Sequence, residues 1–238
     1  MDLAMKNKKK KPDFAIVQCD GACEPKNPGG IAAYGWHATL PNGNQLEGRG
    51  IHAIGPGATN NVAEYAAAIE ALNSLANYNW KGGVRIESDS QLLVCQASGI
   101  WRVNSENLYR LLKQLRSIEK RFQKVTYRWI PREKNQRADC LSRQAVWEKS
   151  IELLEPKTKT LKIKKIDEDH YLVSSQSVED KWYRVTKSSC DCPAFQRISK
   201  VPCKHIAALT KYLAENPGSS PKLQSEEEIN LTEQNHPA

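Results

Sequence analysis

The segment that decides the fold is residues 31–53, IAAYGWHATLPNGNQLEGRGIHA, which contains two strand-like runs around a short turn. Ile31–Leu40 and Gln45–Ala53 flank a Pro-Asn-Gly-Asn sequence that is typical of a hairpin turn. A further β-rich run, Phe14–Cys19, precedes this pair and ends at Asp20-Gly21. The chain is therefore predicted to contribute three consecutive antiparallel strands to a sheet.

Helical periodicity begins at Asn61, soon after the hairpin. Apolar residues form one stripe of this segment, and alanines occupy most of its other faces, which suits a helix packed closely against a sheet. Next come a strand at Val84–Ser88, helices at Ser90–Ala97 and Ser105–Phe122, a strand at Val125–Ile130 and a helix at Asn135–Lys149. This order predicts an α/β fold in which helices flank a five-stranded mixed sheet.

A second, smaller unit is predicted after a linker that contains Pro156 and mixed charge. Its short strands begin near Leu161, and a short helix ends it. The predicted division is a disordered basic arm at 1–12, a first domain at 13–149, the linker at 150–160, the small β/α domain at 161–215 and a disordered acidic tail at 216–238.

The formal net charge of +8 on 238 residues is unevenly distributed. Between Arg102 and Arg137, eleven Lys or Arg residues stand against three Glu. Such a stretch indicates a polyanionic partner, nucleic acid rather than a membrane, although a solvated helix face would explain it equally well.

Composition argues against two classes of protein. No uncharged apolar run reaches the ~18 residues that a membrane span needs, and no apolar run follows the N-terminal lysines as in a secretory signal. Seven cysteines in such a chain indicate free thiols or metal ligands rather than disulfides. We therefore expect a cytoplasmic protein that binds no membrane. A monomer is the working expectation, and nothing in the composition bears on it.

Four carboxylates stand where a sheet would gather them. Asp20 and Asp89 follow apolar strands, while Glu64 and Asp139 lie in predicted helices. Clustered carboxylates repel one another unless cations are bound, and hard oxygen ligands suit a pair of Mg²⁺ or Mn²⁺ ions of the kind that cleaves phosphodiesters. The ordinary alternatives are a turn at Asp20-Gly21, a capping box from Asn61 to Glu64, an N-cap at Asp89 and an ion pair of Asp139 with Arg143.

These carboxylates belong to short motifs whose order resembles type 1 ribonucleases H. The motifs are DGAC at 20–23, NPG at 27–29, TNNVAEY at 59–65, SDSQ at 88–91 and RAD at 137–139. The predicted order of strands and helices is also similar to the fold of that family. The resemblance covers residues 13 to 149.

The resemblance implies hydrolysis of the RNA strand of an RNA–DNA hybrid by two divalent ions, leaving a 5′-phosphate and a 3′-hydroxyl. It assigns Asp20, Glu64, Asp89 and Asp139 as the metal-binding carboxylates. It also implies hybrid contacts by Cys23, Asn27, Asn60, Asn61 and Gln91, which are short polar side chains suited to 2′-hydroxyl groups. Helix capping by Asn60 and Asn61, and a turn position for Cys23, remain alternatives.

The sequence departs from the family pattern in two places. Many members carry a His about ten residues before the last Asp, where this chain has Trp129. Arg132 resembles the Arg of a His-lacking branch, and we expect it to contact the scissile phosphate or to assist product release; otherwise it is one more basic loop residue. The link between Ala97 and Ser105 is also too short for the basic substrate-binding insertion of some members.

A second metal site is predicted near the C-terminal helix. Cys190, Cys192, Cys203 and His205 form a C-x-C-x10-C-x-H pattern of thiolate and imidazole ligands, which favours one structural Zn²⁺ in a closed tetrahedral site. The alternative is that reduced cysteines simply pack as small apolar residues. With the short strands before it, the pattern resembles the SWIM zinc finger, a family associated with binding DNA or proteins.

Aromatic and basic residues are mixed in this second unit. They are compatible with a surface for DNA or RNA, or with a small core that has a solvated rim. The residues are Trp182, Tyr183, Arg184, Lys187, Arg197, Lys200 and Lys204.

Together these features predict a metal-dependent endoribonuclease of the ribonuclease H type, with a zinc module that aids nucleic-acid binding or targeting. The alternatives are a catalytically silent hybrid-binding protein and a DNA-acting nuclease or strand transferase on the same fold.

Overall fold

The computed structural model describes residues 13–154, 158, 160–198 and 200–217. The predicted basic arm and nearly all of the predicted acidic tail lie outside these residues. The chain divides into two compact units, Met1–Val146 and Trp147–Ala238. Each unit is described by itself.

The first unit contains a five-stranded mixed sheet in the order β3-β2-β1-β4-β5. β1 is antiparallel to β2, and β2 to β3, whereas β1, β4 and β5 run parallel. The predicted hairpin and the predicted mixed sheet are therefore both present. The strands are β1 at Phe14–Glu24, β2 at Ile31–Thr39, β3 at Gln45–Ile54, β4 at Gly83–Ser88 and β5 at Lys124–Trp129.

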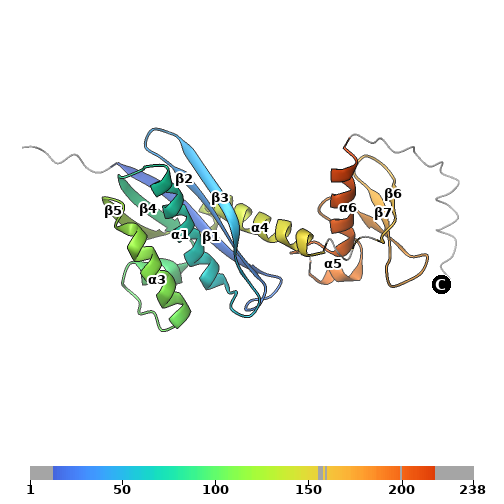
Figure 1. The fold of residues 1–238 in the computed structure, drawn as a ribbon, viewed down its shortest axis with the longest axis horizontal. Coiled ribbons are helices and arrows are strands. Elements are labelled where there is room, and N and C mark those ends of the chain that lie inside the picture. The colour runs from blue at the N-terminus through green and yellow to red at the C-terminus, as the bar shows by residue number, and fades with distance from the viewer. Residues whose placement is uncertain (1–12, 155–157, 159, 199, 218–238) are drawn as a thin grey trace, which may run out of the picture. The chain divides into compact units, whose positions relative to one another are not determined.

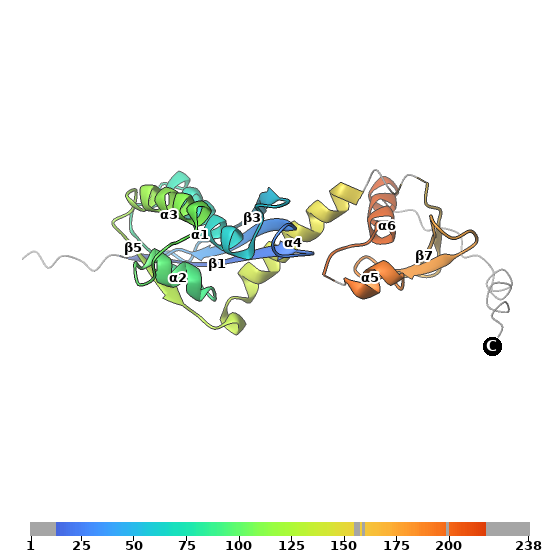
Figure 2. The same ribbon diagram turned by 90° about the horizontal axis from the view of Figure 1, so that it is seen from below.

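Helices cover both faces of this sheet (Figures 1 and 2). α1 and α3 lie together on one face, and α4 crosses the other face. Gly35 of β2 lies directly beneath α4, because a Cβ added at this glycine would stand 2.4 Å from the Ser142 backbone nitrogen. The helical elements that begin in this unit are α1 at Asn60–Asn77, α2 at Gln91–Ala97, α3 at Glu106–Glu119, the 3₁₀ turn η1 at Arg132–Lys134 and α4 at Gln136–Leu154, whose residues from Trp147 on belong to the second unit.

Alanine lets α1 approach the sheet closely. Ala63, Ala67, Ala68 and Ala71 are fully buried, as is Leu72 on the same helix. Small side chains on several faces keep the helix backbone close to β1 and β2, as the sequence predicted. This close packing brings the first turn of α1 up against β1.

One predicted boundary and two of the alternative interpretations are wrong in ways that matter for the site. β1 continues past Asp20 to Glu24, because its antiparallel pairing with β2 extends to that residue. Thr59, not Asn61, caps α1, and Ser90, not Asp89, caps α2. Because Thr59 and Ser90 cap the helices, the side chains of Glu64 and Asp89 are not used for capping.

The predicted linker begins too early in the sequence. α4 continues to Leu154, so residues 150–154 are helical rather than extended. The segment Ile151–Leu154 contains good helix formers, and the residue before Pro156 is disfavoured in a helix.

The second unit has a three-stranded antiparallel sheet in the order β6-β7-β8. Its elements are β6 at Ile163–Lys165, β7 at Tyr171–Ser174, β8 at Trp182–Val185, α5 at Pro193–Arg197 and α6 at Lys204–Glu215 (Figure 1). Residues from β7, β8 and α6 share one buried cluster with Cys190 and Cys192. Among the described residues, no helix is long and apolar enough to cross a membrane.

Candidate active site and cysteine-rich centre

Three of the four predicted carboxylates converge where β4 ends, beside the middle of β1. Asp20, Glu64 and Asp89 each offer an oxygen, and these atoms all lie within 4.8 Å of one another. The parallel pairing of β1 with β4 ends at Gln18 and Glu87, so Asp20 and Asp89 both lie just beyond it. A cluster at the carboxyl ends of these strands was predicted, although Asp20 lies within β1 rather than at its end.

Glu64 reaches the cluster because Gly21 has no side chain. A Cβ at position 21 would lie 2.3 Å from the Glu64 backbone nitrogen, so only glycine permits α1 to sit this close to β1. The Gly21 N–H donates to the Glu64 carboxylate, and Ser88 Oγ lies 3.5 Å from Glu64 Oε2. The Asp20-Gly21 pair thus supplies one carboxylate of the cluster and leaves the space that Glu64 needs to join it.

Burial and mutual repulsion hold protons on this cluster. Burial raises the pKa of Asp20 to about 7, the hydroxyl of Ser142 opposes the rise, and the charges of Asp89 and Asp139 add to it. Burial followed by the charges of Asp20 and Asp89 raises the pKa of Glu64 well above its usual range. A divalent cation would stabilise the ionised form of these buried carboxylates by offsetting their mutual repulsion. Carboxylate oxygens are also the hard donors that such cations prefer.

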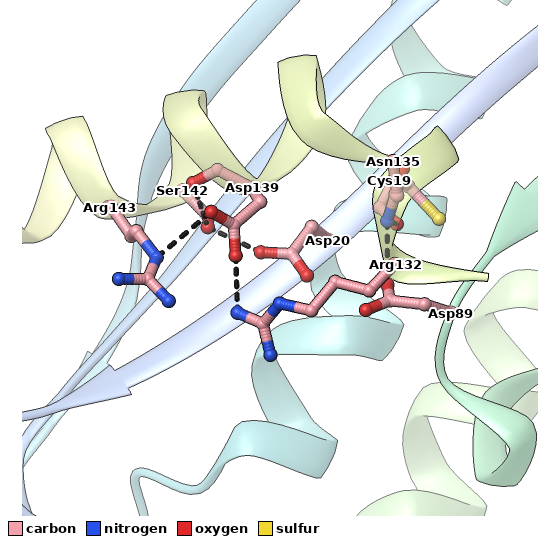
Figure 3. A network of polar contacts seen from close by, with 8 residues as sticks. All are labelled: Cys19, Asp20, Asp89, Arg132, Asn135, Asp139, Ser142 and Arg143. Carbon is pink, nitrogen blue, oxygen red and sulfur yellow. Dashed lines mark hydrogen bonds and ion pairs between the residues drawn. The ribbon is translucent and has the colours of Figure 1, made fainter.

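Asp139 lies beside the cluster, where its carboxylate faces two arginines (Figure 3). Arg132 Nη2 stands 2.5 Å from Asp139 Oδ1, and Arg143 Nε stands 3.0 Å from Oδ2. The fourth carboxylate is therefore near enough to raise the pKa of Asp20, yet it is outside the set of three. The ion pair with Arg143 that served as the ordinary alternative is present as well.

Two polar residues that the sequence interpretation missed hold the carboxylates in place (Figure 3). Asn135 is fully buried, and its Nδ2 donates to Asp89 Oδ1 at 2.7 Å and to the Cys19 carbonyl at 2.9 Å. Ser142 Oγ donates to Asp20 Oδ2 at 2.5 Å. Nothing in the sequence distinguishes these two residues from a helix start and a helix-surface serine.

Four of the five predicted substrate contacts are exposed. Asn60 and Asn61 begin α1, Gln91 begins α2 just after Asp89, and Asn27 Oδ1 accepts from the Asn60 N–H at 3.1 Å. Cys23 is different, because it is 3% exposed and its Sγ lies 3.4 Å from the Ala58 carbonyl oxygen, to which it donates. The Cys23 side chain thus holds the backbone at Ala58 against β1 and is buried, so it is not exposed to a substrate.

Trp129 is the last residue of β5, and Arg132 follows it at the start of η1. Arg132 lies in η1 with its side chain 61% exposed. Trp129 Nε1 donates to the Asp89 carbonyl oxygen at 3.0 Å, so this residue supports the backbone beside the cluster.

The second unit gathers the predicted cysteine and histidine ligands. One atom from each of Cys190, Cys192, Cys203 and His205 lies within 4.8 Å of the other three. His205 Nδ1 stands 3.7 Å from Cys190 Sγ and 3.8 Å from Cys203 Sγ. The N–H groups of Cys192 and Phe195 point at the sulfurs of Cys190 and Cys192.

This donor set fits a closed zinc site. Three sulfurs and one imidazole nitrogen match the tetrahedral Cys₃His sites that hold structural Zn²⁺, and backbone N–H groups stabilise thiolate charge. The thiol of Cys190 donates to Cys203, and this hydrogen bond lowers the pKa of Cys203 to about 4. The ring of His205 packs against Tyr183 at 4.7 Å between centroids, which fixes its orientation.

The sequence profile described as reverse transcriptase-like matches residues 18–145, a span that contains all four acidic residues. The chain belongs to this ribonuclease H-like family. A second profile, the SWIM zinc finger, matches residues 172–214 and contains the Cys₃His set. Both resemblances predicted from the motifs are confirmed, as is the ribonuclease H fold.

Several known proteins share the ribonuclease H domain. The chain is 32% identical over 136 residues to bifunctional protein Rv2228c of Mycobacterium tuberculosis, covering 55% of this chain and 35% of that protein. It is 36% identical over 127 residues to ribonuclease HI of Halobacterium salinarum, covering 53% and 61%. The chain thus spans about a third of the length of the mycobacterial protein.

A solved structure extends the comparison to a complex with nucleic acid. LC11-RNase H1, crystallised with an RNA/DNA hybrid, is 33% identical, and the match has a TM-score of 0.51 and covers 57% of this chain and 98% of the other.

Proposed function

We propose that this protein is an endoribonuclease that hydrolyses the RNA strand of RNA–DNA hybrids and leaves 5′-phosphate and 3′-hydroxyl ends. The observation that carries the proposal is the convergence of Asp20, Glu64 and Asp89 within 4.8 Å, with Asp139 beside them, in a ribonuclease H fold. The complex of LC11-RNase H1 with an RNA/DNA hybrid supports the choice of substrate.

The four carboxylates would hold two Mg²⁺ or Mn²⁺ ions. Such a pair activates the attacking water and stabilises the leaving oxygen of a phosphodiester. Asn135 and Ser142 orient Asp89 and Asp20 by hydrogen bonds, so these ligands are in place before substrate arrives. Because burial raises the pKa of both Asp20 and Glu64, bound cations would favour the ionised form of these carboxylates.

Substrate selection falls to the exposed side chains around the cluster. Asn60, Asn61 and Gln91 offer amide groups that are suited to the 2′-hydroxyls that distinguish RNA from DNA. Arg132 offers a guanidinium for the phosphate at the cleavage site. The reach of its side chain is shown by its present contact with Asp139.

Basic side chains on the outer face of α3 would add to the affinity for the substrate. Leu108 and Leu115 face the core, while Lys113 of α3 is exposed, as are Lys120 and Arg121 directly after the helix. Phosphate contacts from this face would substitute for the basic insertion that the short α2–α3 link lacks.

The SWIM unit would contribute affinity or targeting rather than chemistry. A closed Cys₃His zinc site has no open position for a reactant. A tethered second binding surface raises the effective concentration of substrate at the active site.

The decisive experiment incubates the full chain with a labelled RNA–DNA hybrid in Mg²⁺ and in EDTA. We expect endonucleolytic products with 5′-phosphate ends in Mg²⁺ and none in EDTA. Binding without cleavage in Mg²⁺ or Mn²⁺ would identify a silent hybrid-binding protein. Cleavage or joining of a matched DNA duplex in preference to the hybrid would identify a DNA-acting enzyme.

A further inference from the structure

The second unit carries a groove that the proposed hydrolysis does not use. The groove has a volume of about 480 Å³ and opens on the sheet of β6, β7 and β8, within the size range of small-ligand sites. Its lining residues are His170, Leu172, Trp182, Arg184, Thr186, Ser189, Asp191 and Gln196.

Strand alternation explains why this face is open. In β8, Tyr183 and Val185 are buried in the cluster with α6 and the cysteines, so Trp182 and Arg184 must point to the opposite face. In β7, Leu172 pairs with Arg184 and lies on that same face. Among the described residues, α6 contacts β7 and β8 in the buried cluster on the other side.

The open face combines an aromatic ring with cations. Lys164 Nζ lies 5.0 Å from the centroid of the Trp182 ring. Arg184 is exposed and forms no ion pair with any residue in the described part of the chain. An indole beside two cationic side chains is complementary to a base that is joined to phosphates.

The polar rim suits the edge of a base. Gln196 Nε2 already donates to the Cys190 carbonyl at 3.2 Å, which leaves its oxygen as an acceptor. Asp191 supplies a second acceptor, and the hydroxyls of Thr186 and Ser189 complete the rim. An acidic side chain here would not assist a plain polyanion, but it accepts hydrogen bonds from the N–H groups that bases present on their edges.

We propose that this groove binds an unpaired nucleotide of a single-stranded nucleic acid. The base stacks on Trp182 above Leu172, its edge faces Asp191 and Gln196, and Arg184 and Lys164 pair with the flanking phosphates. Bases within a duplex are already stacked, so only a single strand can place a base in the groove. The proposal specifies the ligand of the SWIM unit and does not depend on hydrolysis by the first unit.

The test measures binding of a fluorescein-labelled 18-residue single-stranded DNA of mixed sequence to the full zinc-loaded chain, by fluorescence anisotropy. Trp182→Ala should weaken binding about tenfold, because stacking on one aromatic side chain contributes that much per base. Trp182→Phe, which keeps an aromatic face, should recover most of the affinity. Val178→Ala is the matched control, because Val178 is 50% exposed and does not line the groove.

Two variants that each remove one positive charge give a second, independent measurement. Arg184→Ala should reduce the slope of log K against log salt by about 0.7, the value for one phosphate contact on a single strand. Lys211→Ala removes the same charge from α6, away from the groove, and should leave the slope closer to wild type. Zinc content and hybrid cleavage by each variant show that both units are intact.

Equal single-strand affinity of wild type and Trp182→Ala would overturn the proposal and would leave the groove to a protein partner. Undetectable single-strand binding by the wild type would overturn it too. If the wild type failed to cleave hybrid but bound single strands through Trp182, the proposed hydrolytic function would be wrong. The proposal that the groove binds a single strand would still be supported.

Discussion

The carboxylate cluster of the first unit draws its ligands from positions 20, 64 and 89, whereas the Cys₃His set of the second unit lies wholly between positions 190 and 205. Distant ligands meet only after the sheet and α1 have packed, so folding of the first unit creates the site. Local ligands can meet in a small unit with a modest core, where metal binding supplies much of the folding free energy.

The two sites also differ in donor chemistry and in access. Oxygen ligands suit Mg²⁺ and leave room for water and substrate, and Asp89 and Asp139 are only partly buried. Sulfur and imidazole ligands suit Zn²⁺, and Cys190, Cys192 and His205 are buried. This difference is why we propose a catalytic role for the carboxylate cluster and a structural role for the Cys₃His set.

Removing a ligand from the carboxylate cluster should abolish activity without unfolding the chain. Asp89→Asn keeps an oxygen that can accept from Asn135 Nδ2 but removes a charge needed for cations. We expect hybrid cleavage to fall by about a thousandfold or more, the equivalent of several kcal/mol of transition-state stabilisation, while hybrid binding changes little. Single-turnover kinetics and anisotropy measure the two quantities.

The matched control is Glu133→Gln, which removes an exposed carboxylate from η1. This variant should cleave hybrid at close to the wild-type rate. An Asp89→Asn enzyme with more than a tenth of wild-type activity would contradict the metal-ligand role.

Removing a ligand from the Cys₃His set should have the opposite outcome. Cys192→Ser is expected to lose bound zinc and to make the second unit sensitive to proteolysis, because its core includes the metal ligands. The turnover rate on saturating hybrid should change less than threefold, while single-strand affinity falls. Zinc analysis, limited proteolysis and steady-state kinetics follow these three quantities.

Cys140→Ser serves as its control, since Cys140 is an exposed thiol outside the cysteine set. It should retain zinc and protease resistance. If the Cys192→Ser chain kept one zinc and a compact second unit, the structural role of the metal would be wrong.

The elements of the fold could be predicted because each one carries its own local signal. Turn chemistry placed the β2–β3 hairpin, helical periodicity with alanine placed α1, and the order of the remaining elements followed. The carboxylates were predictable because they sit in motifs beside these elements. The Cys₃His set was predictable because its spacing is local.

The features that the sequence did not predict all depend on contacts between residues far apart in the chain. Asn135 contacts Asp89 across 46 positions, and Ser142 contacts Asp20 across 122. Asp20 lies within a strand because β2 pairs beyond it, which is a property of the partner strand rather than of the Asp20 segment. Burial of Cys23 against Ala58 likewise depends on a loop 35 residues away.

A smaller effect concerns stability rather than activity. The pKa of Asp20 is raised to about 7 chiefly by burial, so the folded chain binds more protons than the unfolded chain between about pH 4 and pH 7. Stability of the first unit in EDTA should therefore fall as pH rises through this range. Mg²⁺ should restore it at pH 8, because cations bind the ionised cluster.

Asp20→Asn isolates this contribution. The variant cannot ionise at this position, so its melting temperature in EDTA should lie several degrees above wild type at pH 8 and closer to it at pH 5. Glu133→Gln should follow the wild type at both pH values. Calorimetry that found the same pH dependence in wild type and Asp20→Asn would show that ionisation of the buried Asp20 does not limit stability.

The smallest expected effect separates two arginines that contact the same carboxylate. Arg132 and Arg143 both pair with Asp139, but only Arg132 lies in the loop that is assigned to the substrate phosphate. If Arg132 acts on substrate, Arg132→Ala should lower turnover about three- to tenfold, the range for a typical hydrogen bond made by an exposed side chain, while Arg143→Ala stays within twofold. Arg132→Lys should recover part of the loss. Equal losses in both alanine variants would instead mean that each arginine acts only by holding Asp139.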